Sequence, residues 1–307
     1  MNKKYIIGLL ILGLLIIGSF SLFGNKKNGI VSNNQIKVVA SFYPLYFFTS
    51  QIAGDKAIVS NITPAGAEPH DYEPTARDIA NVEDSNLLVL NGGGLESWSK
   101  NIVTNLKQNK TMVVTAGDGL TTKLLLEEGE TVTDPHIWLS PILAKQMIDK
   151  IENGLSTIDS VNSSYYKSNA QNLKIKLDLL DSEYKQGLTN CKSKDIITSH
   201  SAFGYLAQTY NLNQVSIAGL SPEEEPSSKQ MADISKFAKD NNVKYIFFES
   251  LVSPKLSETI AKEIGAKTLV LNPIEGLTID EINSGKDYFS EMRSNLVNLK
   301  IALQCTQ

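Results

Sequence analysis

Residues 159–189 read DSVNSSYYKSNAQNLKIKLDLLDSEYKQGLT and form the longest periodic segment of this 307-residue chain. The apolar and aromatic residues of this segment recur at spacings of three and four, which is the pattern of one face of a single helix. These residues are Tyr166, Ala170, Leu173, Leu177, Leu180, Tyr184 and Leu188. At 1.5 Å per residue, about 29 helical residues give a rod of about 43 Å, longer than a small lobe is wide. We therefore predict that one long, rigid helix joins two lobes.

Short apolar strands alternate with helices on both sides of this segment. Strands are expected at 36–42, 57–62, 87–90 and 111–115 before it, and at 195–199, 214–218, 243–248 and 268–271 after it. Because these strands are mostly apolar, both faces of each sheet should be covered, as in parallel sheets. The predicted fold is α/β, with a mostly parallel four-stranded sheet flanked by helices in each lobe. We expect an N-terminal lobe at 36–158, containing a polar loop at 117–133, a linking helix at 159–189 and a C-terminal lobe at 190–307.

The first 35 residues have the pattern of an export segment and tether. Lys3 and Lys4 precede 19 uncharged residues at 5–23, which is long enough to cross a bilayer core of about 30 Å as a helix. The basic start predicts a cytoplasmic N-terminus and an extracytoplasmic body, at the cell surface or in a periplasm. A cleaved signal peptide and a retained membrane anchor both remain possible, because residues 19–21 make only a weak cleavage site. Residues 24–35 are polar and suit a tether.

The charge distribution restricts the class of partner. The formal net charge is −4, but the first 29 residues hold four lysines and no acids. The remaining residues therefore carry 25 basic against 33 acidic side chains, a net charge of −8. An acidic body of this kind disfavours nucleic acid as a partner and suits cations.

The chain has two cysteines, Cys191 and Cys305. Neither follows the apolar N-terminal segment, so lipid attachment at such a cysteine is not expected. In an oxidising compartment the two could form a disulfide, which would close a loop of about 114 residues and contribute about 4 to 5 kcal/mol in the chain-entropy model. Two separate thiols are the alternative, and the sequence does not decide between them. A metal-binding role is not expected, because the cysteines lack the close spacing of thiolate sites.

Three histidines, His70, His136 and His200, are the only ones in the chain. Two of them directly follow a proline, which indicates rigid loops that aim a side chain. Together with Glu275, all three lie at or beyond the carboxyl ends of predicted strands, where open parallel sheets bind ligands. Three imidazoles and one carboxylate make a four-coordinate set that suits a borderline metal, Zn²⁺ above all. For each histidine taken alone, a surface or hydrogen-bonded role is the alternative.

Five motifs give the chain a resemblance to a known family. They read EPHDYEP at 68–74, DPHIW at 134–138, SHSAFGY at 199–205, SPEEEPS at 221–227 and NPIEGLT at 272–278. In this order they resemble the zinc and manganese solute-binding proteins of ABC importers. The resemblance implies two lobes bridged by a rigid helix, one transition metal in the cleft between them, and delivery of that metal to a permease in the cytoplasmic membrane. It places the metal ligands at His70, His136, His200 and Glu275, and we expect the protein to be a monomer.

The third ligand position indicates which metal is bound. In this family it is a histidine in zinc binders and typically a carboxylate in manganese binders, and here it is His200. Nitrogen ligands favour zinc, whereas oxygen-rich sets suit manganese. We therefore predict an extracytoplasmic, high-affinity zinc-binding protein, with a manganese- or iron-binding member of the same family as the alternative. Many zinc binders carry a histidine-rich loop before the second ligand; here that loop holds Glu127, Glu128 and Glu130 and no histidine, so a metal-gathering role for it is not expected.

Two functions from other classes compete with zinc carriage. A zinc hydrolase would keep a coordination position for water and a general base nearby. Here Glu275 fills the fourth position of the proposed site, and the sequence has no His-Glu-x-x-His motif. We therefore predict that the protein is not an enzyme. An adhesin or structural surface protein would use the metal only for folding, and chelation would then unfold it. The roles of Glu68, Asp71 and Glu249, which lie near the proposed ligands, remain open. Each could orient a ligand, and Glu68 or Asp71 could also take the place of a ligand.

Overall fold

The computed structural model describes residues 35–306 except 107–109 and 128. Residues Ile36–Gln307 form one compact unit. Apart from Gln35, the predicted export segment and tether at 1–35 lie outside the described residues. Within the described ranges, no helix is both long enough and apolar enough to cross a membrane.

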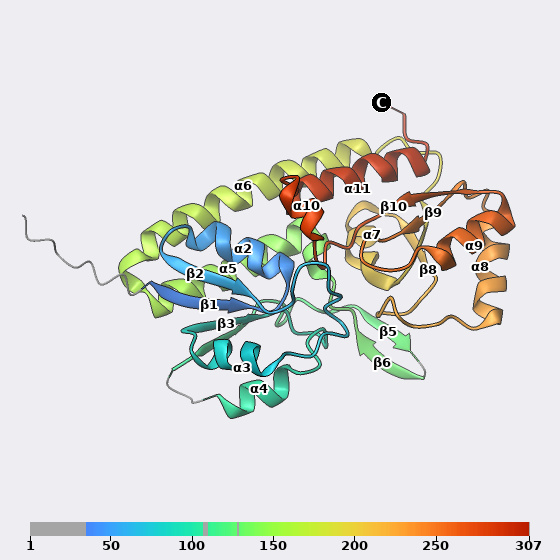
Figure 1. Ribbon diagram of the computed structural model, residues 1–307. Helices are drawn as coiled ribbons and strands as arrows, with labels where there is room; N and C mark the ends of the chain where they lie inside the picture. Colours follow the sequence, from blue (N-terminus) through green and yellow to red (C-terminus); the bar gives the residue numbers. More distant parts are fainter. Residues whose placement is uncertain (1–34, 107–109, 128, 307) are drawn as a thin grey trace, which may run out of the picture. The chain divides into compact units, whose positions relative to one another are not determined.

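Two four-stranded parallel sheets form the framework of the compact unit (Figure 1). The strands are β1 (Ile36–Ala40), β2 (Ala57–Asn61), β3 (Leu87–Leu90) and β4 (Met112–Thr115) in the first sheet, and β7 (Asp195–Thr198), β8 (Asn213–Ser216), β9 (Tyr245–Phe248) and β10 (Lys267–Val270) in the second. The first sheet has the order β2-β1-β3-β4 and the second β10-β9-β7-β8. In each sheet the first strand lies between the second and the third, so the two lobes repeat one topology. The predicted α/β fold with two parallel four-stranded sheets is confirmed.

Helices cover both sheets. They are α2 (Tyr43–Ala53), α3 (Ala76–Glu83), α4 (Ser99–Asn105) and α5 (Pro141–Ile158) in the first lobe, α6 (Ser163–Gly187) between the lobes, and α7 (Gly204–Tyr210), α8 (Ser228–Asp240), α9 (Lys255–Ile264), α10 (Ile279–Asn283) and α11 (Tyr288–Ala302) in the second. Alternate residues of β1 enter different cores: Val38 packs with α2 and α5, whereas Val39 packs with Val82 of α3 and with Trp98. This alternation explains why the strand is apolar on both faces from Val38 to Ala40, whereas Lys37 near its start is exposed.

The long helix α6 connects the lobes as predicted. It has 25 residues, about 37 Å at 1.5 Å per residue, and follows a 3₁₀ turn at Ser160–Asn162. All seven residues of its predicted apolar face are buried. On the first lobe, Asn169 donates a hydrogen bond to the carbonyl of Ile52 at 3.0 Å, and on the second, Tyr184 donates one to the carbonyl of Met292 at 2.6 Å. The helix therefore packs against elements of both lobes.

The segment at 117–133 is not the polar loop that the sequence predicts, because it contains a β-hairpin. Strand β5 (Leu124–Glu127) pairs antiparallel with β6 (Glu130–Thr133). Gly129 takes a φ of 89° at the turn, a conformation that glycine adopts without strain. The sequence did not predict this hairpin, because the glutamates at its turn are typical of a polar loop. One of them, Glu128, lies outside the described residues. The short helix α10 was also not predicted.

The two cysteines form a disulfide between Cys191 and Cys305. The bond ties the segment after α6 to the end of α11. Backbone hydrogen bonds support it on both sides, from Lys192 to Leu303 at 3.0 Å and from Thr306 to Asn190 at 2.9 Å. The disulfide alternative that the sequence left open is therefore the one the structure adopts.

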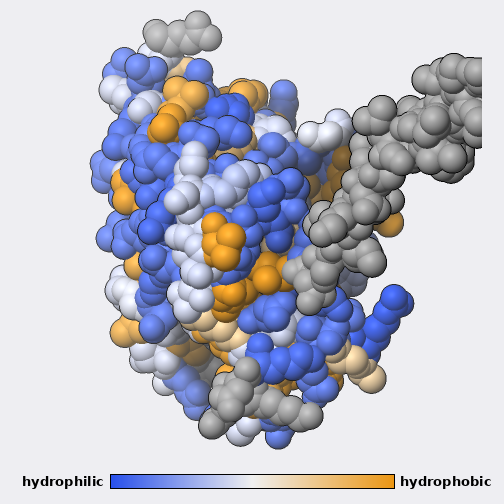
Figure 2. Space-filling view, turned by 90° about the vertical axis from the view of Figure 1, so that its left-hand side faces the viewer, coloured by the Kyte–Doolittle hydropathy of each residue, from blue (hydrophilic) through white to orange (hydrophobic). Residues whose placement is uncertain are grey.

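Hydrophilic residues cover most of the face seen in Figure 2, and hydrophobic residues on it occur in small groups between them. Single exposed apolar residues such as Val161, which is 92% exposed, are ordinary on a surface that faces water. The features that point to function lie inside the molecule, at the edges of the two sheets.

Candidate metal centre

The four predicted ligand residues come together at one point between the lobes. His70 lies in the loop between β2 and α3, and His136 directly precedes the 3₁₀ helix Ile137–Leu139. In the second lobe, His200 lies two residues after β7 and Glu275 five residues after β10. One ligand atom from each of the four lies within 4.8 Å of the others. Residues separated by as many as 205 positions therefore share one small volume.

The distances between the ligand atoms suit a single metal ion. His136 Nε2 is 3.2 Å from His70 Nε2 and 3.3 Å from His200 Nε2. Glu275 Oε1 is 3.0 Å from His136 Nε2 and 3.4 Å from each of the other two Nε2 atoms. A tetrahedral zinc site with bonds of about 2.0 to 2.1 Å has edges of about 3.3 to 3.4 Å. Five of the six distances among the four atoms are therefore close to the edges of such a tetrahedron, and all four atoms lie within 4.8 Å of one another.

Burial makes this group of side chains unusual. The side chains of His136, His200 and Glu275 have 0% exposure and that of His70 has 10%. Glu275 Oε2 is also buried and accepts no hydrogen bond from the described residues. A buried carboxylate is costly unless it is paired or binds a metal. The donor set and its burial both fit a bound cation.

The electrostatics of the group follow from its mutual contacts. Burial alone would raise the pKa of Glu275, but the charge of His200 and hydrogen bonds from the three imidazoles outweigh it and hold that pKa well below its usual range. Burial alone would lower the pKa of His200, yet Glu249 and Glu275 together raise it well above the usual value. Burial would also lower the pKa of His136, but Asp134 and Glu275 outweigh burial and raise this pKa. For His70, burial dominates and lowers the pKa.

A carboxylate lies behind each of the two fully buried histidines. Asp134 Oδ1 accepts hydrogen bonds from the backbone N–H of His136 at 3.0 Å and from its Nδ1 at 2.9 Å. Glu249 Oε1 lies 2.6 Å from His200 Nδ1. Such pairs place the ring proton on Nδ1 and turn the lone pair of Nε2 toward a metal. The role that the sequence left open for Glu249 is therefore supported by geometry, whereas the role of Asp134 was missed, although it stands two residues before His136 in the DPHIW motif.

The loop that carries Glu275 holds a strained backbone. Ile274 is fully buried and has a φ of 59°, a conformation that β-branched residues avoid. Asn272 Oδ1 accepts the N–H of Ile274 at 2.7 Å. Asn295 of α11 in turn holds Asn272 through two hydrogen bonds to its backbone, at 2.8 and 2.7 Å. This network keeps Ile274 in place and thereby aims Glu275.

Contacts between the lobes set the distance between the ligand loops. The indole N–H of Trp138 donates to the carbonyl of Pro273 at 2.7 Å, and Tyr288 donates to the carbonyl of Trp138 at 2.6 Å. Trp138 lies two residues after His136, and Pro273 lies two residues before Glu275. At the start of α7, a Cβ on Gly204 would lie 2.6 Å from Asp134 Oδ2, so only glycine allows this close approach.

Glu68 and Asp71 have different environments beside His70. Glu68 Oε1 accepts the backbone N–H of His70 at 3.3 Å. Burial, followed by the negative charge of Glu275, raises the pKa of Glu68 to about 9. Asp71 is exposed. Glu68 therefore supports the loop of His70 from inside, and Asp71 faces the solvent.

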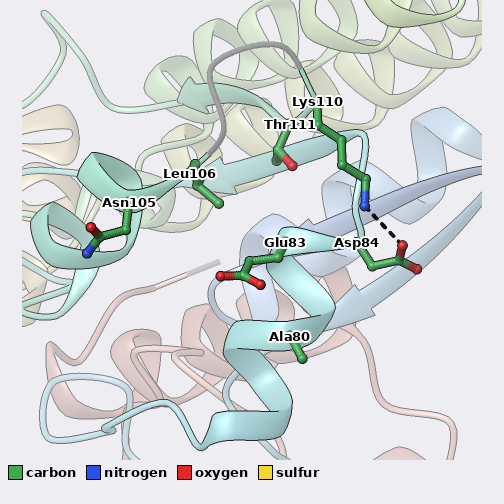
Figure 3. A pocket seen from close by; sticks show the side chains of 7 residues that line it. All are labelled: Ala80, Glu83, Asp84, Asn105, Leu106, Lys110 and Thr111. Atoms are coloured by element: carbon green, nitrogen blue, oxygen red, sulfur yellow. Dashed lines mark hydrogen bonds and ion pairs between the residues drawn. The ribbon is translucent and has the colours of Figure 1, made fainter.

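A separate hollow of about 230 Å³ lies in the first lobe, where α3, α4 and β4 meet (Figure 3). The Lys110 ammonium pairs with the Asp84 carboxylate at 3.1 Å on its wall. Both side chains are more than half exposed, so the pair is a surface ion pair of small energetic value. This hollow contains none of the four predicted ligand residues.

Two parallel-sheet lobes joined by a long helix, with a buried group of three histidines and one glutamate between them, define a two-lobed metal-binding protein. The family described as zinc-uptake complex component A, periplasmic (ZnuA) matches residues 38–302. The chain belongs to this family, which consists of metal-binding solute-binding proteins and is not a family of enzymes.

The relatives share both sequence and fold with this chain. It is 39% identical over 303 residues to the high-affinity zinc uptake system protein ZnuA of Bacillus subtilis, covering 94% of each chain. The Zn(II)-bound ZnuA-like domain of Streptococcus pneumoniae AdcA superposes with a TM-score of 0.76 at 39% identity, over 88% of this chain and 99% of that domain. The laminin-binding protein Lmb of Streptococcus agalactiae, described as having adhesin and metal transporting activity, gives a TM-score of 0.77 at 36% identity, over 87% of this chain and 99% of Lmb. The chain spans 57% of the length of the zinc-binding protein AdcA of Streptococcus pyogenes.

Proposed function

We propose that this protein captures Zn²⁺ outside the cytoplasm and delivers it to an ABC permease for import. The observation that carries the proposal is the arrangement of His70, His136, His200 and Glu275, whose ligand atoms lie 3.0 to 3.4 Å apart in five pairs. These are the four residues that the sequence predicts as ligands, and the relatives named above are zinc-uptake and zinc-binding proteins.

Zinc is the metal that this donor set favours. Three imidazole nitrogens and one carboxylate oxygen, at the spacing of a tetrahedron, suit Zn²⁺ better than Mn²⁺, which prefers oxygen ligands and six-coordinate geometry. Asp134 and Glu249 strengthen this preference, because a carboxylate on Nδ1 makes the opposite nitrogen a better donor. A manganese- or iron-binding protein of the same family is the second candidate.

Carriage fits the site better than catalysis. Four protein ligands complete a tetrahedral zinc site, whereas catalytic zinc keeps one position for water or substrate. The two lobes, proposed at 36–158 and 190–307 with residues 159–189 between them, each supply two ligands. Such a division allows the lobes to close over the metal and separate to release it. We place residues 1–35 as the export segment and tether, and the partner as the permease in the cytoplasmic membrane, with the protein itself a monomer.

Titration calorimetry on residues 36–307, combined with metal analysis of the purified protein, tests this proposal. We expect one zinc ion per chain and much weaker binding of manganese. Equal affinities for the two metals would contradict the zinc assignment, and a stoichiometry of zero would contradict metal carriage altogether.

Chelation separates carriage from a structural role of the metal. Lmb is described as an adhesin as well as a metal transporter, so a surface-binding role is a fair rival. A carrier should release zinc to a chelator and keep its circular dichroism spectrum. A protein that needs the metal to fold would lose that spectrum.

A further inference from the structure

A cavity of about 430 Å³ opens beside His70, between the two lobes. The first lobe contributes His70 and Asp71, the loop after β3, and the end of the β5–β6 hairpin with Pro135. The second lobe contributes the loop after β8, with Leu220, Ser221 and Glu224. The cavity therefore lies where a movement of one lobe relative to the other would change its width.

Of the four proposed ligands, His70 is the one that lines this cavity. It is also the one whose side chain keeps some exposure, at 10% against 0% for His136, His200 and Glu275. A hydrated cation in the cavity would therefore exchange its first water for His70 before it reaches the other three.

The charges on the cavity wall favour a cation. Asp71 and Glu224 line it and are both exposed. The lining residues that the structure describes include no lysine or arginine. Carboxylates on the walls of a cleft raise the local concentration of cations and their rate of encounter.

A second cavity, of about 460 Å³, approaches the site from another direction and suits a cation less well. Tyr43, Phe47, Leu277 and Ile282 give it a largely apolar wall, and the positive charge of Lys286 on this wall is offset by the negative charge of Asp287. Glu275 is among its lining residues, but the Glu275 side chain has 0% exposure. A hydrated divalent ion would have to lose water against apolar groups on this route, at a cost in free energy.

We propose that zinc enters and leaves the four-residue site through the cavity beside His70, with His70 as the first ligand and Asp71 and Glu224 accelerating the encounter. This inference rests on the zinc-binding function proposed above. It concerns rates, whereas that function concerns equilibrium binding, so the two can be tested separately.

Filling each cavity in turn gives the sharpest test. Ser221→Trp narrows the His70 cavity and Ala65→Trp narrows the second one; Ser221 is partly exposed and Ala65 exposed, so neither change disturbs a core. In stopped-flow mixing with zinc and a fluorescent chelator, Ser221→Trp should slow association and dissociation severalfold and by similar factors. Ala65→Trp should leave both rates unchanged. The reverse pattern would overturn the proposed route.

Charge removal provides an independent test. Asp71→Asn and Glu224→Gln should each slow zinc association about twofold to threefold at low ionic strength, and the difference should shrink as salt is added. Glu258→Gln, which removes an exposed carboxylate on α9, is the matched control and should leave the rate unchanged. Equal rates in all three variants would contradict a role for Asp71 and Glu224. If the unmodified protein binds no zinc at equilibrium, the proposed function is wrong. If it binds zinc, but the zinc association and dissociation rates of the variants equal those of their controls, only the proposed route is wrong.

Discussion

The loop that carries Glu275 and the loop that carries His70 are held in different ways. In the second lobe, Asn295 holds Asn272, and Asn272 holds the strained Ile274 directly before Glu275. In the first lobe, the loop of His70 has the support of Glu68 and of one hydrogen bond between lobes, from the N–H of Gly66 to the carbonyl of Leu277 at 3.0 Å.

For the four proposed ligands, this difference implies different roles. His136, His200 and Glu275 are fully buried and held by hydrogen bonds, so they form a preorganised receptor. His70 keeps contact with the solvent-facing cavity, so it can bind a cation that still carries water. Preorganisation lowers the free-energy cost of binding, because the ligands need not be ordered when the metal arrives.

Removing a ligand should have the largest effect. The free energy of zinc binding at sites with four protein ligands is about 10 to 16 kcal/mol. One ligand therefore accounts for about 3 kcal/mol of this free energy, or a factor of about 100 in zinc affinity. His200→Ala and His70→Ala should both reach that loss in calorimetry. His200→Ala should also lower the melting temperature of the metal-free protein, because the buried Glu249 loses the imidazole and keeps, among the described residues, only the hydrogen bond from Ser199.

His70→Ala should leave that melting temperature unchanged, since His70 lies at the edge of the group. If both variants destabilise the metal-free fold equally, the contrast between the two ligand loops is wrong.

Lowering the pH should weaken zinc binding. His136 and His200 have raised pKa values, so in the metal-free protein both bind a proton at a higher pH than a free imidazole does, and zinc must displace the protons that they carry. The affinity should therefore fall as the pH drops through the raised pKa values, by up to about 100-fold per pH unit when two protons are released. His70, with its lowered pKa, should add nothing at neutral pH. Calorimetry in buffers of different ionisation enthalpy counts the protons, and an affinity that does not change between about pH 5 and 8 would contradict a three-histidine site.

Loss of a carboxylate behind a histidine should have an intermediate effect. Glu249→Gln removes the charge that orients His200 and should lower zinc affinity about 10-fold to 100-fold. Asp134→Asn should do the same for His136. Glu258→Gln, which removes an exposed carboxylate on α9, serves as the control in the same titration. A Glu249→Gln variant with unchanged affinity would show that His200 needs no such support.

Loosening the strained loop should have the smallest effect. Asn295→Ala removes both hydrogen bonds to Asn272 and should lower the free energy of unfolding by about 1 to 3 kcal/mol, with a severalfold loss of zinc affinity. Asn298→Ala, also on α11, removes a hydrogen bond to the carbonyl of Val270 at 2.8 Å and is the matched control. Asn298→Ala should lower the free energy of unfolding without changing the zinc affinity. Equal losses of zinc affinity in both variants would mean that the hydrogen bonds of Asn295 do not position Glu275.

Local patterns predicted most of the fold and singled out the four residues that the structure brings together. The period of α6 is visible at Tyr166, Leu173 and Leu180, because one face of that helix is buried along its whole length. The apolar strands and the motifs around the histidines are equally local. Their convergence could be inferred, since carboxyl ends of parallel strands meet at one edge of a sheet.

Contacts between distant residues could not be predicted in this way. Asn272 and Asn295 lie 23 positions apart, and His200 and Glu249 lie 49 apart, so no periodicity connects them. The left-handed conformation of Ile274 contradicts the preference of isoleucine and is imposed by its neighbours. The β5–β6 hairpin was missed because the glutamates near its turn resemble a solvated loop.

Anomalous diffraction at the zinc edge, on crystals of residues 36–307 grown with one equivalent of zinc, tests the central claim most directly. We expect one strong peak at about 2.0 to 2.2 Å from His70 Nε2, His136 Nε2, His200 Nε2 and a carboxylate oxygen of Glu275. A peak bound to other residues, or one from which Glu275 or any of the three histidines is absent, would contradict the proposed site.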